Sequence, residues 1–359
     1  MKKMMKRVVA GALALSMTVL MAACGGSDES TGSVAQTSSG STAGATTIKV
    51  WVSSGAEDDV YRETFDKMET ELGITINLTM YDAADDMAKQ VEQATILVGE
   101  KPDFVIINLA EVASGQQLVD MFTAADIPFL FYNKEPSAET VQSVVVEPGS
   151  IFIGTTPREA GDMQGEILSD MYNADPSSVD LNGDGVVHFV EFMGEPNNPE
   201  AIARTQYSEE TAIALGVPLE AVLEDPIVAN WDTAQANERM TATWAAHPEI
   251  EVVFCNNDDM ATGVIAAMNN FNYNTGREGD PSLVVIGVDA TDAAFEAIAN
   301  GRMTATVKQD GDAMGYANVR IAVNYLQTGT WLDGLDYTLA EDGYSVRIPY
   351  AKITADEVE

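Results

Sequence analysis

Short runs of apolar and β-branched residues alternate with amphipathic stretches of helical length from residue 48 to about residue 326. The first run, residues 48–53, is followed by a helix-like stretch at residues 60–72. Further strands are predicted at residues 74–80, 103–109, 128–132, 187–193, 219–223, 251–256, 283–288 and 303–308. Helices are predicted at residues 83–98, 110–121, 157–171, 199–215, 233–246, 258–270, 293–300 and 313–326. Such alternation favours an α/β fold with parallel, doubly wound sheets.

The segment that carries this alternation is too long for a single core. Roughly 310 residues exceed the size at which one hydrophobic core keeps growing, so two α/β domains are expected. Polar residues stand where several predicted strands end, namely Ser53, Asn108, Asn133, Asn256, Asp289 and Gln309. Open α/β sheets bind ligands at that edge. We therefore expect a ligand that bridges the two domains.

The first 46 residues have the composition of export and anchoring segments. Four basic residues precede an uncharged run from residue 8 to residue 23, which is the pattern of a secretory signal at residues 1–23. Cys24 directly follows the small residues of the cleavage site, which indicates a lipobox and a lipid-modified cysteine. Residues 24–46 are mostly Ser, Thr, Gly and Ala, and they are predicted to form a flexible tether. The chain is thus expected to be lipid-anchored to the outer face of the cell membrane.

The chain is strongly acidic, with a formal net charge of −37. Removing the signal takes away four basic residues and no acidic ones, so the mature charge is about −41. Nucleic acids and anionic membrane surfaces are poor partners for such a charge, and membrane contact is expected through the lipid alone. With Cys24 modified, only Cys255 remains, so no disulfide is expected. Cys255 ends an apolar run and fits the role of a small buried residue.

A calcium loop is predicted at residues 180–188. Asp180, Asn182 and Asp184 place hard oxygen ligands on alternate residues around a glycine. Together with Glu191 they also match the EF-hand pattern, which requires a helix on each side. Pro176 interrupts the approach, and residues 186–192 are rich in β-branched and aromatic residues, which favours a strand. An ordinary Asp/Asn/Gly turn without metal remains the simpler alternative.

Several motifs resemble those of the galactose/glucose-binding proteins, the substrate-binding components of ABC sugar importers with the type I periplasmic-binding-protein fold. The resemblance runs from about Ile48 to the C-terminus. Its motifs are Phe131-Tyr-Asn-Lys-Glu-Pro-Ser137, Asp180-Leu-Asn-Gly-Asp-Gly, Gly194-Glu-Pro, Ala203-Arg-Thr205, Trp231-Asp-Thr-Ala-Gln-Ala236, Asn256-Asn-Asp258, Gly287-Val-Asp-Ala290 and Val346-Arg-Ile-Pro-Tyr350. Their order and spacing make the resemblance specific.

The resemblance implies two Rossmann-like lobes joined by a three-strand hinge. The crossings are expected near Ile127, Gln309 and Val346. The first lobe would then comprise residues 47–127 plus 309–346, and the second lobe residues 128–308 plus 347–359. Ligand binding between the lobes would favour a closed form, without any covalent change to the ligand.

The resemblance also implies which residues hold a sugar. A pyranose needs planar amide, carboxylate or guanidinium groups for its hydroxyls and aromatic rings for its C–H faces. The implied sugar-binding residues are Asp59, Tyr61, Asn108, Asn198, Glu200, Arg204, Trp231, Asn257, Asp289 and Gln309. Asn198, Glu200 and Gln309 depart from the family's histidine, aspartate and asparagine, so the preferred monosaccharide can differ. As a simpler alternative, Asn108 and Asp289 could cap helices and Trp231 could pack into a core.

For calcium, the resemblance adds the carbonyl of Val186, the side chain of His188 and the distant carboxylate of Glu251 to Asp180, Asn182 and Asp184. The ion would be structural. His188 departs from the family's glutamine, and calcium prefers oxygen to imidazole nitrogen.

Three other functions are alternatives to sugar import through an ABC permease and ATPase. A secreted glycoside-acting enzyme lacks a nucleophile and base pair in the sequence, although a carboxylate pair is not excluded. A sugar-responsive repressor does not fit the export signal or the acidic charge. A sensor that binds a sugar or another small polar ligand and acts through a chemoreceptor remains open. The protein is expected to be a monomer.

Overall fold

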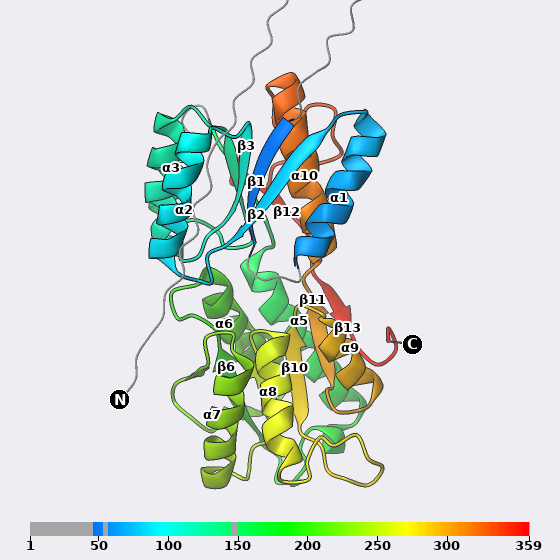
Figure 1. Ribbon diagram of the computed structural model, residues 1–359. Helices are drawn as coiled ribbons and strands as arrows, with labels where there is room; N and C mark the ends of the chain where they lie inside the picture. The colour runs from blue at the N-terminus through cyan, green and yellow to red at the C-terminus, as the bar shows by residue number, and fades with distance from the viewer. Residues whose placement is uncertain (1–45, 53–56, 145–148, 359) are drawn as a thin grey trace, which may run out of the picture. The chain divides into compact units, whose positions relative to one another are not determined.

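A computed structural model describes residues 46–52, 57–144 and 149–358 of the chain. These residues form two β-sheets, each covered by helices on both faces (Figure 1). The predicted signal peptide, Cys24 and the predicted tether up to residue 45 lie outside the described residues. None of the helices in the described ranges is both long enough and apolar enough to span a membrane.

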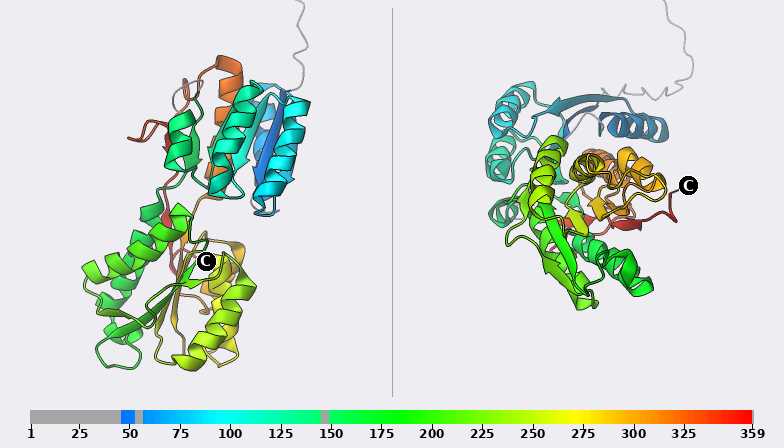
Figure 2. Two further views of the ribbon diagram at one scale, coloured as in Figure 1. Left: turned by 90° about the vertical axis from the view of Figure 1, so that its left-hand side faces the viewer. Right: turned by 90° about the horizontal axis from the view of Figure 1, so that it is seen from below.

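The first sheet has six strands in the order β12-β5-β4-β3-β1-β2, and all neighbouring strands are parallel. Its strands are β1 (Thr46–Val52), β2 (Ile76–Asp82), β3 (Phe104–Asn108), β4 (Phe129–Tyr132), β5 (Phe152–Gly154) and β12 (Ser345–Arg347). Its helices are α1 (Glu57–Leu72), α2 (Met87–Glu100), α3 (Gly115–Ala124), α4 (Ala138–Val144) and α10 (Gly311–Thr328). Helices α1 and α10 pack on one face through a core that includes Phe65 and Val319. Helices α2 and α3 pack on the other face through Leu97 and Phe122. The left view of Figure 2 shows these two helices in front of the sheet.

The second sheet has the strand order β13-β11-β10-β9-β6-β7, and β8 also pairs with β6. Its strands are β6 (Val187–Met193), β7 (Leu219–Ala221), β8 (Ile227–Val228), β9 (Val252–Cys255), β10 (Val284–Val288), β11 (Ala305–Lys308) and β13 (Ala351–Ile353). Its helices are α5 (Pro157–Ala174), α6 (Pro199–Ala214), α7 (Thr233–Ala246), α8 (Asp258–Asn269) and α9 (Asp292–Ala299). All pairs are parallel except β11 with β13, so the expected pair of doubly wound parallel sheets is confirmed, with one antiparallel edge.

The sheet order corrects the first expected crossing. We expected it near Ile127, but β4 pairs with β3 and β5 pairs with β4, so both strands belong to the first sheet. The chain instead crosses between Gly154 and Pro157. The second crossing lies between Lys308 and Gly311. The third lies between Arg347 and Ala351, just beyond Val346, which is in β12.

We call residues 46–154 with 311–347 the first lobe, and residues 157–308 with 351–358 the second lobe. The first, second and third crossings are residues 155–156, 309–310 and 348–350. Each lobe buries one apolar cluster on each face of its sheet. Burial of alternate strand residues on opposite faces follows from the two-residue period of a strand.

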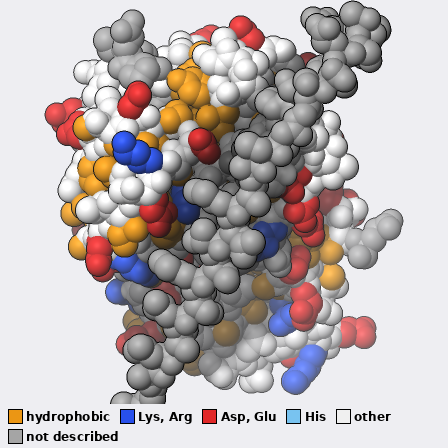
Figure 3. All heavy atoms as spheres, turned by 45° about the horizontal axis from the view of Figure 1, so that its top comes forward, with side chains coloured by type: hydrophobic (Ala, Val, Ile, Leu, Met, Phe, Trp, Pro, Cys, Tyr) orange, Lys and Arg blue, Asp and Glu red, His pale blue; other side chains and the backbone are white. Residues whose placement is uncertain are grey.

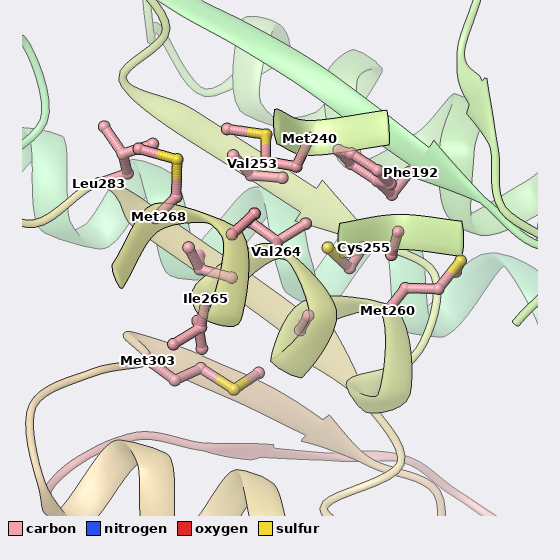
Figure 4. Packing of buried hydrophobic residues seen from close by; sticks show 14 of the residues in the cluster. Phe192, Met240, Val253, Cys255, Met260, Val264, Ile265, Met268, Leu283 and Met303 are labelled. Carbon is pink, nitrogen blue, oxygen red and sulfur yellow. The ribbon is translucent and has the colours of Figure 1, made fainter. Parts of the chain in front are cut away.

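The cluster beneath α7, α8 and α9 is rich in methionine. Figure 4 shows Met240, Met260, Met268 and Met303 packed around Val264 and Ile265 of α8. Cys255 lies in the same cluster with no exposed surface, and burial raises the pKa of its thiol well above the ordinary value. On the surface, Figure 3 shows Asp and Glu side chains spread over the visible face, with fewer Lys and Arg side chains between them.

Candidate functional site

The largest group of predicted site residues lies at the carboxyl edge of the second sheet. Five of them make up what we call the Arg204 cluster, which consists of Glu200, Arg204, Trp231, Asp289 and Gln309. Glu200 and Arg204 lie in the first turns of α6, which begins after β6, while Asp289 and Gln309 directly follow β10 and β11. The parallel order of β6, β9, β10 and β11 brings these strand ends to one edge.

Arg204 is the centre of the cluster and is only 3% exposed. Its Nη1 donates to the carbonyl of Asn256 at 2.7 Å, and its Nη2 donates to the Tyr350 hydroxyl at 2.8 Å and to Gln309 Oε1 at 3.3 Å. Glu200 Oε2 lies 3.4 Å from Nη2. Burial alone would lower the pKa of Arg204, but Tyr350, Glu200 and a third neighbour, Asp289, hold it above its ordinary value. The guanidinium therefore stays charged.

Trp231 is held next to Arg204 by a strained backbone and by a glycine. Its ring centroid is 5.9 Å from the Arg204 guanidinium carbon. Its φ of 65° is in the left-handed region, where a bulky residue is an outlier whose strain the surrounding structure must hold. A Cβ on Gly194 would lie 2.3 Å from Cε2 of the Trp231 ring, so only glycine admits the indole there. Asn257 Nδ2 donates to the Trp231 carbonyl at 3.3 Å.

Asp289 has an unusual backbone and an unusual acidity. Its φ is 119°, and Ala290 follows with 62°. Its Oδ1 lies 3.8 Å from Arg204 Nη1, which is beyond hydrogen-bond distance, and its side chain is 32% exposed. Desolvation raises the pKa of Asp289 to about 8, although Arg204 opposes the shift. The carboxylates of Asp258, Asp259 and Glu200 add to it.

Four buried polar atoms near the two sheet edges have no hydrogen-bond partner in the described part of the chain. They are Arg204 Nε, Trp231 Nε1 and both polar atoms of the Asn108 amide. Buried polar groups are nearly always paired, so each such exception needs an explanation. Donors from a guanidinium and an indole, together with an amide, could pair with the hydroxyls of a polar ligand.

Asn108 is the site residue that comes from the first lobe. It ends β3 and is 4% exposed. The buried side chain of Gln90, on α2, fixes the backbone on both sides of it: Gln90 Nε2 donates to the Asn108 carbonyl at 2.7 Å, and Gln90 Oε1 accepts from Ala110 N at 3.0 Å. The backbone at Asn108 is therefore fixed, and its side-chain amide, which has no partner, does not cap a helix.

Tyr61, another predicted residue of the first lobe, does not join this group. Tyr61 is buried in the core of the first lobe, where its hydroxyl accepts from Asn318 Nδ2 at 2.7 Å and its ring lies edge-on to Tyr132. This placement differs from the expected stacking position, because α10 covers the ring. Asp59 lies in α1, but its side chain is outside the described part of the structure.

Three predicted residues of the second lobe have side-chain oxygens that accept hydrogen bonds from other groups of the protein. Asn198 Oδ1 caps α6 by accepting from the backbone N–H of Glu200 at 2.8 Å. Asn257 Oδ1 caps α8, and its amide nitrogen binds Trp231 as described. Glu200 Oε1 accepts from Thr155 Oγ1 at 2.8 Å and Oε2 accepts from Tyr350 at 2.9 Å.

Sequence reasoning assigned no role to three residues that hold Arg204 and its neighbours. Tyr350 and Thr155 belong to the third and first crossings, and the Asn256 carbonyl receives Arg204 Nη1. Tyr350 and Asn256 are in motifs that carried the resemblance, which was the available signal. Thr155 stands two residues before the proline that starts α5, a position with no chemical signature of its own.

The predicted calcium loop lies at the opposite, amino edge of the second sheet. Residues 180–186 precede β6, and Glu251 precedes β9. Glu251 is 2% exposed and aims both oxygens at the loop, accepting from the backbone N–H of Asn182 and of His188 at 2.9 Å each. Asp180 accepts from the N–H groups of Gly183 and Gly185.

These residues fit calcium in donor type and in topology. Asp180, Asp184 and Glu251 supply carboxylates, the ligands that calcium prefers, and the distant Glu251 is already directed into the loop. Their oxygens accept backbone N–H groups, and in the described ranges no three acidic, histidine or cysteine side chains are gathered closely enough to form a ready metal cluster. His188 Nδ1 lies 3.5 Å from Glu251 Oε2.

The EF-hand alternative does not fit the structure. Residues 187–193 form β6, as expected, and not the second helix of an EF-hand. Glu191 is directed into the interior, where Ser208 Oγ donates to its Oε1 at 2.5 Å. Burial raises the pKa of Glu191 well above its ordinary value. The carboxyl group at the twelfth loop position is therefore not available to the loop.

A cavity of about 440 Å³ lies away from both groups. It is bordered by α3, α4 and the amino ends of β4 and β5, with Tyr325 of α10 at one side. None of the predicted site residues lines it.

Comparison with known proteins agrees with this arrangement. The family model described as periplasmic binding protein domain matches residues 45–330. The D-galactose/methyl-galactoside binding periplasmic protein of Haemophilus influenzae is 31% identical over 299 residues, which are 83% of this chain and 85% of that protein. The ribose import binding protein of Salmonella typhimurium is 21% identical over 70% of this chain and 75% of its own length.

Among solved structures, an ABC transporter solute binding protein from Bacillus halodurans with bound myo-inositol has a TM-score of 0.67. Its sequence identity is 25%, and the match covers 88% of this chain and 96% of the other. The two parallel-sheet lobes thus have the type I periplasmic-binding-protein fold that the sequence predicted. This chain belongs to the periplasmic binding protein family.

Proposed function

We propose that this protein captures a monosaccharide outside the cytoplasm and delivers it to an ABC sugar importer. The sugar would bind between the carboxyl edges of the two sheets, with Arg204, Asp289 and Trp231 on one side and Asn108 on the other. Its partners would be the permease and ATPase subunits of the importer. No covalent step on the sugar is part of this proposal.

The observation that carries the proposal is the set of unpaired polar atoms beside an aromatic ring. Arg204 Nε, Trp231 Nε1 and the Asn108 amide are buried without hydrogen-bond partners. Asp289 supplies an acceptor or, when protonated, a donor close to the Arg204 guanidinium. A ring with several hydroxyls matches this combination, because it both donates and accepts hydrogen bonds and presents C–H faces to an indole. Two relatives are named for D-galactose and ribose and a third holds myo-inositol, and all three compounds are polyhydroxylated.

The same proposal includes an anchor at Cys24. The basic residues, the apolar run and the small residues before Cys24 support lipid modification of this cysteine after export. The tether that follows would let the two lobes reach a permease in the same membrane. A change of Cys24 to alanine should release the protein from membranes into the soluble fraction of cells.

We also propose that the loop at residues 180–188 binds one structural calcium ion. Asp180, Asn182, Asp184, Val186 O, His188 and Glu251 would hold it, and the ion would crosslink the loop to the start of β9. The argument rests on the placement of Glu251, a buried carboxylate directed into an Asp- and Asn-rich turn.

A panel of ligands tests the sugar proposal. Purified protein without residues 1–24 would be titrated calorimetrically with D-galactose, D-glucose, D-allose, D-ribose and myo-inositol. At least one of them should bind, and the same compound should raise the melting temperature, because a ligand that binds only the native state stabilises it.

Two further measurements give the panel a control. The Arg204→Ala variant should lose the binding, whereas Arg320→Ala, on the α10 helix of the first lobe, should retain it. Absence of binding by the wild-type protein to all five compounds would remove the proposal. Release of a reducing end from aryl glycosides would instead point to an enzyme.

A further inference from the structure

The three crossings between the lobes meet at one buried hydrogen-bonded network. Thr155 comes from the first crossing, Gln309 from the second and Tyr350 from the third. The Tyr350 hydroxyl is 2.9 Å from Thr155 Oγ1, and Gln309 Nε2 donates to the same Oγ1 at 3.4 Å. Arg204 Nη2 donates to both Tyr350 and Gln309. Arg204, which is proposed to hold the sugar, is thus bonded directly to the second and third crossings. It is linked to the first crossing through the contact of Tyr350 with Thr155.

A count of protons shows how this network is ordered. Arg204 has only protons to give, so the Tyr350 hydroxyl must accept from it. The single proton of Tyr350 can then go to Glu200 Oε2 or to Thr155 Oγ1, both at 2.9 Å. Thr155 donates to Glu200 Oε1. Burial raises the pKa of Tyr350, so its hydroxyl keeps the proton that this arrangement requires.

Both oxygens of Glu200 contact the crossings or Arg204. Its Oε1 receives Thr155, and its Oε2 receives Tyr350 with Arg204 Nη2 at 3.4 Å. The side chain is also buried, at 7% exposed. The extra methylene that distinguishes Glu200 from the aspartate of the resembling family therefore reaches the crossings.

We infer that Tyr350 is a positioning residue for sugar binding, and that Glu200 acts with it on Arg204 without contacting the sugar. Tyr350 and Glu200 engage Nη2, and the Asn256 carbonyl engages Nη1, so the guanidinium is fixed at two nitrogens. Its unpaired Nε then points in one direction. This inference rests on the proposed function, because sugar affinity is its readout.

The network explains why a crossing residue should affect affinity. A guanidinium that is already fixed loses less conformational freedom when the sugar binds. Removing the Tyr350 hydroxyl frees one side of Arg204 and leaves Glu200 Oε2 with a single partner. Ordering the Arg204 side chain on binding then costs free energy, which weakens the affinity. The loss should appear mainly as faster dissociation of the sugar.

The test is the Tyr350→Phe variant, which keeps the buried ring and removes only the hydroxyl. The probe is whichever of D-galactose, D-glucose, D-allose, D-ribose and myo-inositol the wild-type protein binds most tightly. We expect Kd to rise about tenfold, as for loss of one hydrogen bond to a charged group, with most of the change in the dissociation rate. Stopped-flow measurements separate the two rates.

A double-mutant cycle distinguishes positioning from general loosening. Glu200→Gln should raise Kd to a similar degree, and the Tyr350→Phe/Glu200→Gln pair should be much less than additive, because both act on the same guanidinium. Tyr344→Phe is the matched control, since it also removes a buried hydroxyl, one that donates to Glu135 and not to the cluster. It should leave Kd unchanged.

Each result decides between the two proposals. An unchanged Kd in Tyr350→Phe, with normal wild-type binding, overturns the inference and leaves the proposed function intact. Additive effects in the cycle, or an equal loss in Tyr344→Phe, also overturn it. Lack of wild-type binding to every probe overturns both. If Tyr350→Phe does not fold, Thr155→Val breaks the same network from the first crossing and must raise Kd for the inference to stand.

Discussion

The two edges of the second sheet carry polar groups of opposite character. At the carboxyl edge, Arg204 Nε and Trp231 Nε1 are buried without partners. At the amino edge, both oxygens of Glu251 and both oxygens of Asp180 accept backbone N–H groups. Unpaired donors thus mark the carboxyl edge. At the amino edge the carboxylates are paired with the backbone, while His188 Nδ1 is buried without a partner.

This difference separates ligand binding from stabilisation within one lobe. Donors that no protein group can reach favour a ligand with its own acceptors. Carboxylates that already order a loop favour a role in stability, which an ion would strengthen. Changes at the carboxyl edge should therefore alter affinity, and changes at the amino edge should alter stability in calcium.

The largest expected effect is on stability, although Arg204 lies at the carboxyl edge. Arg204 also stabilises the fold, because it is the cation beside the buried Glu200. Arg204→Met should lower the free energy of unfolding by about 3–5 kcal/mol, since Glu200 would remain buried without its cation. Urea denaturation measures it. Adding Glu200→Gln should recover part of the loss, because the uncompensated charge is then gone. A loss below about 1 kcal/mol in Arg204→Met would show that the pair is not the main element holding α6 to the crossings.

The next effect concerns affinity alone. Trp231→Ala should weaken binding of the best sugar by about 2 kcal/mol, or about 30-fold, as expected for loss of a central aromatic side chain. Calorimetry measures the change, and Trp231→Phe should restore part of it by retaining a flat ring. Glu251→Gln, at the opposite edge of the same sheet, is the matched control. Equal losses in Trp231→Ala and Glu251→Gln would contradict the separation of the two edges.

The third effect concerns the calcium loop. Wild-type protein should melt at a higher temperature in calcium than in chelator, and Glu251→Gln should abolish most of that difference. In chelator the same variant should lose about 1–3 kcal/mol, because the N–H groups of Asn182 and His188 then face an amide. Glu191→Gln should keep the calcium response, since Glu191 lies in the interior. The reverse pattern would favour the EF-hand ligand set.

The smallest effect is a pH dependence at Asp289, because its side chain is 32% exposed and solvent screening reduces the contribution of its charge to stability. Its pKa is raised to about 8 in the folded protein from an ordinary value of 3.8. Between these values the folded state holds a proton that the unfolded chain has released, so stability falls as pH rises through this range. Asp289→Asn removes the titration and should become increasingly more stable than wild type from pH 5 to pH 8. Melting temperatures across that range measure the trend, and parallel curves would contradict it.

Long, strongly patterned elements were predicted well from the sequence. The strand at residues 187–193 and the helix at residues 233–246 match β6 and α7 to the residue. The strands β5 and β13, of three residues each, were missed because such short runs carry no measurable period. The first crossing came from the resemblance and was placed before β4, which pairs with β3 in the first sheet.

The site was predictable where function coincides with a local signal. Arg204, Trp231 and Asp289 follow strands or open helices, and they are brought together as expected. Tyr350 contacts Arg204 across a separation of 146 residues, which no local pattern reveals. Tyr61 was assigned to the sugar from the resemblance alone, but its burial depends on α10 and Asn318, distant in sequence.

The late return of the chain to the first sheet has a consequence for biogenesis. Helix α10 and strand β12 supply one covering helix and one edge strand of the first lobe, yet they follow the whole continuous segment of the second lobe in the chain. The polypeptide emerges from a secretion channel N-terminus first. The first sheet, which begins with β1, is therefore complete only after β12 has emerged at residue 347. The segment from residue 157 to residue 308 can meanwhile assemble most of its own core. The portion synthesised first is therefore the portion that depends longest on protection from aggregation.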